Sequence, residues 1–153
     1  MTVRPIEKRD YTSFRSLFTD YFNELDCEDD PECTFNEYLL PDFESGGFSV
    51  AVAEEDGAVI GFVIYQIDEL IGEWNFKEGW GDVREMFVAF EHRGRGIGSA
   101  LLKYAEDALL NEGADGVYLL PVEEYEEYFL HRGYEDCGEV CKALTAKVFQ
   151  KKL

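Results

Sequence analysis

The sequence predicts an α/β fold (α+β, with a mixed sheet) whose elements follow the order β-α-α-β-β-β-α-β-α-β-β. Short apolar runs alternate with segments of helical periodicity along the chain. Residues 82–102 contain an apolar strand, a glycine-rich basic turn and the start of an amphipathic helix. The near-continuous apolar run 117–122 is typical of a buried parallel strand. We therefore expect one domain over residues 1–153, with a central and largely antiparallel sheet.

The first third of the chain is expected to form a short strand and two helices. The strand is predicted over residues 3–7. Asp10 is a plausible N-cap for a helix that runs to about Leu25, since apolar side chains recur at helical spacing after it. An acidic loop with Pro31 follows, and the capping-box sequence 34–37 predicts a second helix that ends near Leu40, before Pro41.

The middle of the chain reads as three strands. Residues 48–54 alternate as a strand, Glu55-Asp56-Gly57 is a hairpin turn signal, and residues 58–67 form a second strand rich in β-branched side chains. A loop with several glycines and aromatic residues separates it from a third strand at 83–90, which leads into the glycine-rich turn.

The C-terminal part is expected to alternate between helices and strands. A helix over 99–111 has one apolar face and Gly113 as its C-terminal stop. A strand at 117–122 and a helix at 123–132 follow, and 134–137 and 142–149 are the last strand candidates.

Composition excludes several classes of function. The net charge of −19 disfavours binding to nucleic acid. The chain contains no run of eighteen apolar residues, so no membrane span is predicted. The N-terminal segment lacks the apolar region of a signal peptide. A cytoplasmic location is therefore expected.

The four cysteines are expected to be reduced thiols rather than metal ligands. Their spacings, C-x5-C and C-x3-C, differ from the C-x2-C of zinc ribbons, and both histidines lie elsewhere, so no metal site is predicted. An oxidised sample could join the first pair in a disulfide. The residues concerned are Cys27, Cys33, Cys137 and Cys141.

The glycine-rich turn is a candidate anion site. Glycines allow close approach of the backbone to a ligand, and N–H groups at a helix N-terminus favour negative charge. Two arginines can pair with phosphate oxygens. Between His92 and Lys103 the chain has three cations and no acid, although the whole chain is strongly acidic. The turn consists of Arg93, Gly94, Arg95, Gly96, Ile97 and Gly98, and Ser99 follows it.

Two common phosphate loops do not fit this turn. A P-loop needs Gly-Lys-Ser or Gly-Lys-Thr, and neither occurs in the chain. The dinucleotide pattern G-x-G-x-x-G fails because its sixth position is Ser99 or Leu101. The remaining pattern, [Q/R]-x-x-G-x-[G/A] after a strand, is matched by Arg93, Gly96 and Gly98. This pattern resembles motif A of the GNAT superfamily of N-acetyltransferases, and the resemblance extends over residues 82–134.

The resemblance implies a GNAT-like acyl-CoA N-acyltransferase fold that binds acetyl-CoA. Backbone amides from Arg93 to Ser99 would hold the pyrophosphate, with both arginines as side-chain support. The strand before the loop would diverge from the next strand, and the pantetheine arm would pair with the exposed backbone. A backbone N–H near Phe87 or Val88 would polarise the thioester carbonyl.

The resemblance also suggests how acetyl transfer would proceed. Glu85 is the expected general base, because it shares a strand face with Phe87; the alternative is a solvated carboxylate, and Glu73 and Asp82 are further candidates. Many relatives have a tyrosine as general acid where this chain has Phe129. Its neighbour Tyr128 is the expected substitute, with Tyr125 one turn earlier as another candidate.

The acceptor is expected to be a primary amine of a small cationic molecule or of a protein or peptide. Acidic residues lie in the expected acceptor region, together with aromatic residues that alternatively fill a core or a dimer contact. Pairing of C-terminal strands would give a homodimer. A non-catalytic acyl-CoA-binding module and a nucleotide-phosphate binder of another fold are the competing functions. The acceptor-region residues are Glu24, Asp26, Glu28, Asp29, Asp30, Glu32 and Asp42, with Trp74, Phe76 and Trp80 nearby.

Overall fold

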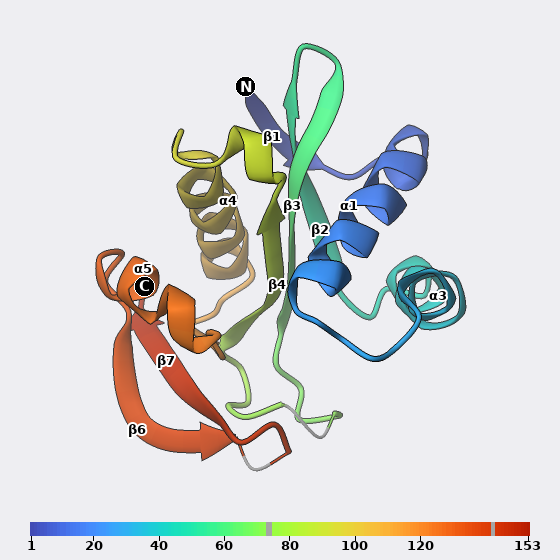
Figure 1. Ribbon diagram of the computed structural model, residues 1–153. Helices are drawn as coiled ribbons and strands as arrows, with labels where there is room; N and C mark the ends of the chain where they lie inside the picture. The colour runs from blue at the N-terminus through green and yellow to red at the C-terminus, as the bar shows by residue number, and fades with distance from the viewer. Residues whose placement is uncertain (73–74, 142) are drawn as a thin grey trace. The chain divides into compact units, whose positions relative to one another are not determined.

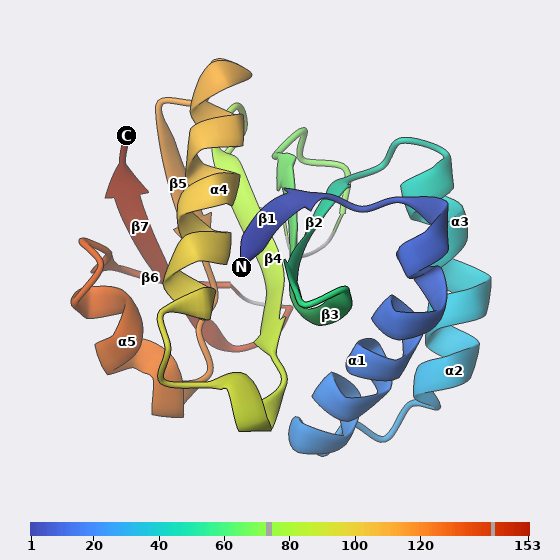
Figure 2. The same cartoon turned by 90° about the horizontal axis from the view of Figure 1, so that it is seen from above.

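The computed structural model describes residues 1–72, 75–141 and 143–153. Its seven strands hydrogen-bond in the order β1-β2-β3-β4-β5-β7-β6, and Figures 1 and 2 together label them. The chain divides into two compact units: the first unit consists of residues 1–64 and 85–105, and the second unit of residues 65–84 and 106–153. The order of helices and strands is the one that the sequence predicts, and the mixed α/β class is confirmed.

The first unit contains the N-terminal strands and the predicted hairpin. β1 (Thr2–Pro5) pairs with β2 (Ser49–Glu55) in antiparallel register, from Thr2↔Glu54 to Pro5↔Ala51. β3 (Ala58–Ile67) has the bounds predicted from its β-branched residues. Asp56 and Gly57 have φ values of 51° and 79° between β2 and β3, as a two-residue hairpin turn requires. The hairpin prediction is therefore confirmed.

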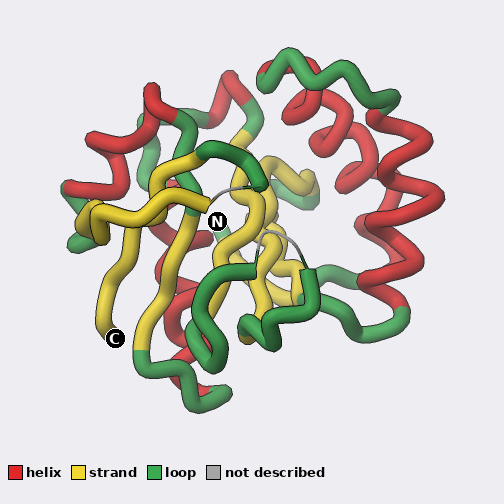
Figure 3. Tube along the Cα trace, turned by 90° about the horizontal axis from the view of Figure 1, so that it is seen from below, coloured by secondary structure: helices red, strands yellow, loops and turns green. Residues whose placement is uncertain are grey.

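Helices cover both faces of β3 within the first unit. α1 (Tyr11–Glu24) buries Phe14, whose ring centroid lies 5.0 Å from that of Phe62 on β3. The following helices lie beside α1, as Figures 2 and 3 show. Gly61 faces α4 (Ile97–Asn111) instead, since a Cβ at Gly61 would lie 3.1 Å from a methyl group of Leu101. Neighbouring strand residues point to opposite faces, so α1 and the first turns of α4 pack on opposite sides of β3.

The predicted bounds of the second helix are wrong. Helical structure begins three residues before Thr34 and continues past Pro41, as α2 (Pro31–Thr34), a π-helical segment (Phe35–Leu39) and α3 (Leu40–Glu44). The N-cap is Asp30, whose carboxylate accepts a hydrogen bond from the Glu32 amide at 3.2 Å. The wider π turn, in which the Leu40 amide bonds to the Phe35 carbonyl, precedes Pro41 and accommodates a residue that has no N–H to donate.

Asp10 is the N-cap residue of α1 by position, but its side chain has another role. It is buried and accepts hydrogen bonds from the Arg4 guanidinium at 2.7 and 2.9 Å and from the Glu7 amide at 2.8 Å. A 3-10 turn (Lys8–Asp10) precedes the helix and directs the carboxylate toward β1. Asp10 therefore joins the start of α1 to the first strand rather than capping the helix.

The second unit contains the start of β4 (Gly81–Val88) and the C-terminal strands. β4 pairs in parallel with β5 (Gly116–Leu119) through Gly81↔Val117 and Asp82↔Tyr118, and β4 continues beyond this ladder to Val88. β5 is buried throughout, as its apolar run predicts, but it ends at Leu119, close to Pro121, which has no ladder N–H.

The remaining elements of the second unit differ from the prediction mainly in length. A 3-10 turn (Glu123–Tyr125) and α5 (Glu126–Leu130) replace the single predicted helix. β6 (Glu135–Cys141) extends beyond the predicted 134–137, with an irregularity between Asp136 and Val140, and is antiparallel to β7 (Ala146–Lys152). The predicted strand 142–149 starts at Lys142, which lies outside the described residues. Gly113 ends α4 with φ 97°, and the Ala114 amide bonds to the Leu109 carbonyl, as predicted.

Asp68 organises the long connection between β3 and β4 in the second unit. Its buried carboxylate accepts hydrogen bonds from the amides of Leu70, Phe76 and Lys77, at 2.6 to 2.7 Å, and from the Tyr118 hydroxyl at 2.8 Å. Burial alone would raise the pKa of this carboxyl group, but these hydrogen bonds outweigh it and hold the pKa below its ordinary value. The loop is therefore built around one ionised side chain.

We expect Asp68→Asn to lower the free energy of unfolding by about 2 kcal/mol at neutral pH, because the amide cannot accept all four hydrogen bonds. A carboxyl group with a lowered pKa stabilises the folded state above the pKa of the unfolded chain, and this contribution disappears as pH falls through the folded-state pKa. The difference between variant and wild type, measured by urea unfolding, should be constant above about pH 5 and should shrink below about pH 4. Glu69→Gln, at the exposed neighbouring position, is the control. A difference that does not change with pH would contradict this account.

We expect Gly61→Ala to destabilise the protein by about 1–3 kcal/mol in the same assay. The added Cβ would lie 2.9 Å from the Phe87 carbonyl oxygen, which belongs to the neighbouring backbone and has little freedom to move. Ala58→Gly, at the exposed start of β3, changes the same two residue types in the opposite direction and should cost less than 1 kcal/mol. Equal effects at the two positions would show that close approach at Gly61 is unimportant.

Candidate active site

The glycine-rich turn of the first unit links β4 to α4. β4 ends at Val88, a 3-10 turn (Phe90–His92) follows, and α4 begins at Ile97. Gly94 and Gly96 have φ values of 75° and 82°, which L-residues with a side chain rarely adopt. A Cβ at either position would meet no atom within 4 Å. The glycines are thus needed for the backbone conformation, and the space beside them is open.

The N-terminus of α4 follows this open turn. The Ala100 amide donates to the Gly96 carbonyl at 3.0 Å, and the amides that precede Ala100 belong to the first turn, where helix geometry directs N–H groups outward along the axis. Ile97 is buried and anchors the helix start, and the first turn contains no acidic residue. The helix dipole therefore favours an anion at this position.

Arg93 is bound to two other parts of the first unit. Its guanidinium pairs with both carboxylate oxygens of Glu24, at 2.9 and 2.5 Å, and its Nε donates to the Val88 carbonyl at 2.8 Å. The same group lies 5.2 Å from the ring centroid of Phe87. Arg93 thus joins the end of α1 to the end of β4, and pairing with a phosphate would require it to exchange its contact with Glu24.

Arg95 also pairs with a carboxylate. Its guanidinium donates to both oxygens of Glu55, at 2.7 and 2.8 Å, and lies 3.1 Å from Nδ1 of His92. The hydrogen bonds from Arg95 lower the pKa of the Glu55 carboxyl group. Both arginines of the turn are therefore neutralised locally, whereas the backbone amides carry no counter-charge.

Glu85 lies on β4 and faces α1. Its carboxylate accepts a hydrogen bond from the hydroxyl of Tyr21, and the Tyr21 ring lies 5.6 Å from that of Phe87. Glu85 and Phe87 thus share a face of β4, as strand alternation predicts. Glu85 is half-buried rather than freely solvated.

Phe87 and Val88 at the end of β4 make different contacts. Phe87 is 6% exposed and belongs to the aromatic core of the first unit, while the Val88 carbonyl is bound by Arg93. The predicted role of these residues rests on their backbone N–H groups, and the Phe87 side chain packs as the sequence suggests.

Tyr128 and Phe129 belong to the second unit and point in different directions. Phe129 is buried, with its ring 5.8 Å from that of Tyr134. The Tyr128 ring lies 3.4 Å from the Arg132 guanidinium, and its hydroxyl oxygen is buried without a hydrogen-bond partner among the described residues. An unpaired buried hydroxyl is costly, so this group is suited to an external partner.

Several other predicted site residues have structural contacts. Asp82 is buried near Tyr118 in the second unit. Trp80 packs beside Gly116, where a Cβ would lie 2.3 Å from its ring, and Phe76 packs against Tyr118 at 5.8 Å. The two aromatic residues therefore contribute to the core of the second unit. Glu73 and Trp74 lie outside the described residues.

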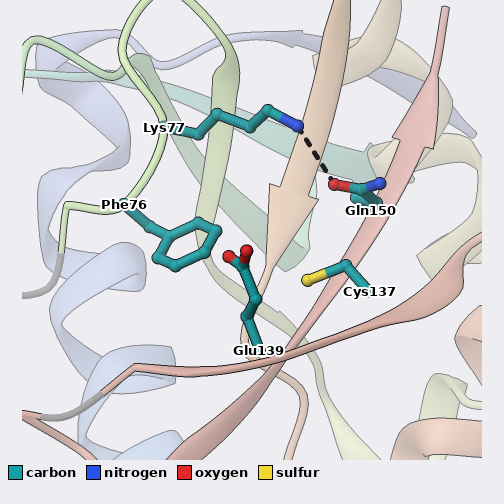
Figure 4. Close-up of a pocket in the computed structure, with 5 residues that line it drawn as sticks. All are labelled: Phe76, Lys77, Cys137, Glu139 and Gln150. Carbon is teal, nitrogen blue, oxygen red and sulfur yellow. Dashed lines mark hydrogen bonds between the residues drawn. The ribbon is translucent and has the colours of Figure 1, made fainter.

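A cavity of about 340 Å³ opens on the second unit. Figure 4 shows Phe76 and Lys77 on one side and Cys137, Glu139 and Gln150 on the other, with Lys77 Nζ donating to the Gln150 side chain at 3.2 Å. Lys77 Nζ also lies 3.6 Å from the Trp80 ring centroid. The lining mixes one cation, one carboxylate and one thiol and has no signature in the sequence.

The helical spacing of apolar residues in 11–24 places Tyr21 on the apolar face of α1, but it does not predict the contact of Tyr21 with Glu85. The spacing that predicts a core position is correct for its ring, but only the pairing of α1 with β4 brings its hydroxyl to the carboxylate. Gly61 was missed for a similar reason, since its close neighbour Phe87 is distant in sequence.

Among the residues that the structure describes, no three His, Cys, Asp or Glu side chains are grouped so that they could hold a metal ion. No helix in this part of the chain is long and apolar enough to cross a membrane. The four cysteines are free thiols, two of them exposed at Cys27 and Cys33.

Comparison with known proteins relates this chain to acetyltransferases. The family model described as "Acetyltransferase (GNAT) family" matches residues 11–138. The uncharacterized N-acetyltransferase YjcF of Bacillus subtilis (strain 168) is 28% identical over 79 residues, which cover 50% of this chain and 56% of that protein. The chain thus matches little more than half the length of this curated relative.

Solved structures share the fold over the whole chain. A ribosomal-protein-alanine N-acetyltransferase from Brucella melitensis has a TM-score of 0.76 at 22% identity, with 100% of each chain covered. The PaiA N-acetyltransferase from Thermoplasma acidophilum, solved in complex with coenzyme A, has a TM-score of 0.75 at 13% identity, again with 100% of each chain covered. With the family model matching most of its length, the chain belongs to the GNAT family of acetyltransferases.

Proposed function

We propose that this protein transfers an acetyl group directly from acetyl-CoA to a primary amine of a small cationic molecule or of a protein or peptide. The proposal rests mainly on the turn at Gly94 and Gly96, which is open to solvent. This turn connects β4, the strand that contains Glu85, to the N-terminus of α4. Family members use acetyl-CoA as donor, and the PaiA enzyme was solved with coenzyme A.

The turn fits the polyphosphate of this donor. Backbone amides from Arg93 to Ser99 would hold the pyrophosphate, since the glycines leave room for close approach. Arg95 is exposed and would bind the phosphate in place of the Glu55 carboxylate. Arg93 would bind it in place of the Glu24 carboxylate. The end of β4, where ladder pairing with β5 has stopped, would offer its backbone to the pantetheine arm.

Glu85 is the proposed general base. An amine acceptor is an ammonium ion at neutral pH, and it must lose a proton before its nitrogen can attack the thioester carbonyl. Glu85 would take that proton directly or through one water molecule. A backbone N–H at Phe87 or Val88 would stabilise negative charge on the carbonyl oxygen.

Tyr128 is the proposed general acid. Cleavage of the carbon–sulfur bond leaves a thiolate, which needs one proton. Phe129 has no proton to give and packs into the core of the second unit, whereas the Tyr128 hydroxyl has no partner in the described structure. The nitrogen loses two protons in all, one from the ammonium ion before attack and one as the amide forms. One proton is delivered to sulfur, and the net proton that remains is released to solvent.

The charge of the chain favours a cationic acceptor. The fold alone does not determine which amine is the acceptor. A ribosomal-protein-alanine N-acetyltransferase and an N-acetylglutamate synthase share the fold with this chain at 22% and 17% identity. Glu24, one of the acidic candidates, pairs with Arg93 and would have to give up this contact to bind an acceptor.

The second candidate function is a non-catalytic acyl-CoA-binding module, which the burial of Phe129 favours. Calorimetric titration with acetyl-CoA and with CoA at two salt concentrations tests the feature that both functions share, and binding should weaken as salt increases. Release of free thiol in the presence of a panel of amines then separates them. Binding without thiol release for any amine would favour the module, and no binding by folded protein would refute both.

We expect Gly96→Ala to weaken binding of CoA at least tenfold, because the alanine strains the left-handed backbone and its methyl group occupies the space beside the turn. Gly57→Ala is a matched control, since Gly57 has φ 79° and equally open surroundings in the hairpin. Both variants should lose about 1 kcal/mol of stability. Calorimetry should show a loss of affinity only for Gly96→Ala, and equal affinities would contradict the assignment of the turn.

We expect Tyr128→Phe to lower kcat about tenfold and to leave the Kd for acetyl-CoA unchanged, because it removes a proton donor and keeps the ring on Arg132. Tyr125→Phe tests the other candidate acid in the same assay. The loss should be greatest with amines whose attack is fast, since thiolate departure then limits the rate. An unchanged kcat in Tyr128→Phe, with a loss in Tyr125→Phe, would move the role to Tyr125.

A further inference from the structure

Tyr21 is a residue of the first unit whose hydroxyl the proposed mechanism leaves without a role. It lies in the last turns of α1 and donates a hydrogen bond to Oε2 of Glu85 on β4. Its ring is enclosed by aromatic side chains, with centroid distances of 5.6 Å to Phe87, 6.0 Å to Phe62 and 6.3 Å to Phe18. The packing fixes the ring, and the ring fixes the direction of the hydroxyl group.

A second contact from the same helix turn holds Tyr21 in register with β4. Glu24 lies three residues after Tyr21, and positions three apart are neighbours on a helix surface. Its carboxylate accepts two hydrogen bonds from Arg93, which also binds the Val88 carbonyl at 2.8 Å. The end of α1 is thus attached to β4 at Glu85 and, through Arg93, at Val88.

Electrostatics keep the Tyr21 hydroxyl protonated. Burial, together with the charge of Glu85 and the hydrogen bond to it, raises the pKa of Tyr21 far above its ordinary value. Glu24 and Cys27 add smaller contributions in the same direction, and Arg93 faces this group from the glycine turn through Glu24. At neutral pH, Tyr21 therefore acts as a hydrogen-bond donor and not as a base.

We propose that Tyr21 is a positioning residue that orients the Glu85 carboxylate and favours its ionised form. A hydrogen bond donated to a carboxylate stabilises the charged state, and one fixed donor limits the rotation of the group. The inference rests on the proposed function in assigning the base to Glu85. It adds that α1, which supplies no reacting group, determines where that base lies and over which pH range it can accept a proton.

The test that needs no acceptor is a titration of the Glu85 carboxyl group by NMR of protein labelled with 13C in its glutamate side chains, with the signal assigned through Glu85→Gln. In Tyr21→Phe the ring packing is kept and only the hydroxyl is lost. We expect the titration midpoint of Glu85 to rise by about one pH unit. An unchanged midpoint in the folded variant would overturn the inference.

Tyr134→Phe is the matched control. Tyr134 is 3% exposed in the second unit, and its hydroxyl donates to the Glu106 carboxylate at 2.9 Å. This variant loses a buried tyrosine–glutamate hydrogen bond of the same kind, so it should lower stability and leave the Glu85 titration in place. A shift of the Glu85 midpoint in both variants would show a general effect of destabilisation and would overturn the assignment to Tyr21.

Kinetics give a second readout once an acceptor is known. The acidic limb of the pH profile of kcat/KM should move to higher pH by the same amount in Tyr21→Phe, and the Kd for acetyl-CoA should not change. Failure of wild-type protein to bind acetyl-CoA refutes the proposed function, whereas binding and turnover with an unmoved profile in Tyr21→Phe refutes only the role of Tyr21. The two failures are therefore distinguishable.

Discussion

The attachment of the last turns of α1 to β4 is the constraint on which the candidate site depends. Tyr21 reaches Glu85, and Glu24 reaches Arg93, which in turn binds the Val88 carbonyl. These contacts come from one helix face and meet one strand and the turn that follows it. Because the same strand carries Glu85 and leads into the glycine turn, a displacement of α1 would alter the proposed base and the proposed anion site together. The aromatic core between α1 and β3 supplies the rigidity that this arrangement needs.

β3 also supports β4, because the two strands approach each other closely at Gly61. Gly61 has no side chain to separate it from the Phe87 carbonyl or from Leu101 of α4. On its opposite edge, the described ladder of β4 with β5 runs through Gly81 and Asp82. The end of β4 is therefore held by β3 and by α1.

Local sequence signals predicted the parts of this structure that depend on backbone conformation. The hairpin at Asp56 and Gly57, the helix stop at Gly113 and the turn at Gly94 and Gly96 follow from residues that tolerate positive φ. The continuation of helical structure past Pro41 could not be predicted, because it depends on a π turn for which the local sequence has no known pattern. The roles of Tyr21 and Asp68 were hidden for another reason. Their partners Glu85 and Tyr118 are distant in sequence. The apolar helix position of Tyr21 and the loop position of Asp68 do not predict such long-range contacts.

The pairing of both turn arginines explains how an acidic protein can present an anion site. In a chain of net charge −19, an exposed guanidinium attracts the nearest carboxylate, and Glu24 and Glu55 occupy Arg93 and Arg95 in this way. A phosphate that approaches must compete with those carboxylates for the side chains, and each exchange replaces one ion pair by another with little net gain. The first turn of α4 contains no acidic residue, and the space beside Gly94 and Gly96 is open, so a phosphate can approach the backbone amides there. In the proposed function, the conformation of Gly94 and Gly96 therefore contributes more to donor affinity than the charge of the arginines does. The arginines, by their contacts with Glu24, Val88 and Glu55, mainly hold the turn in the shape that those amides require.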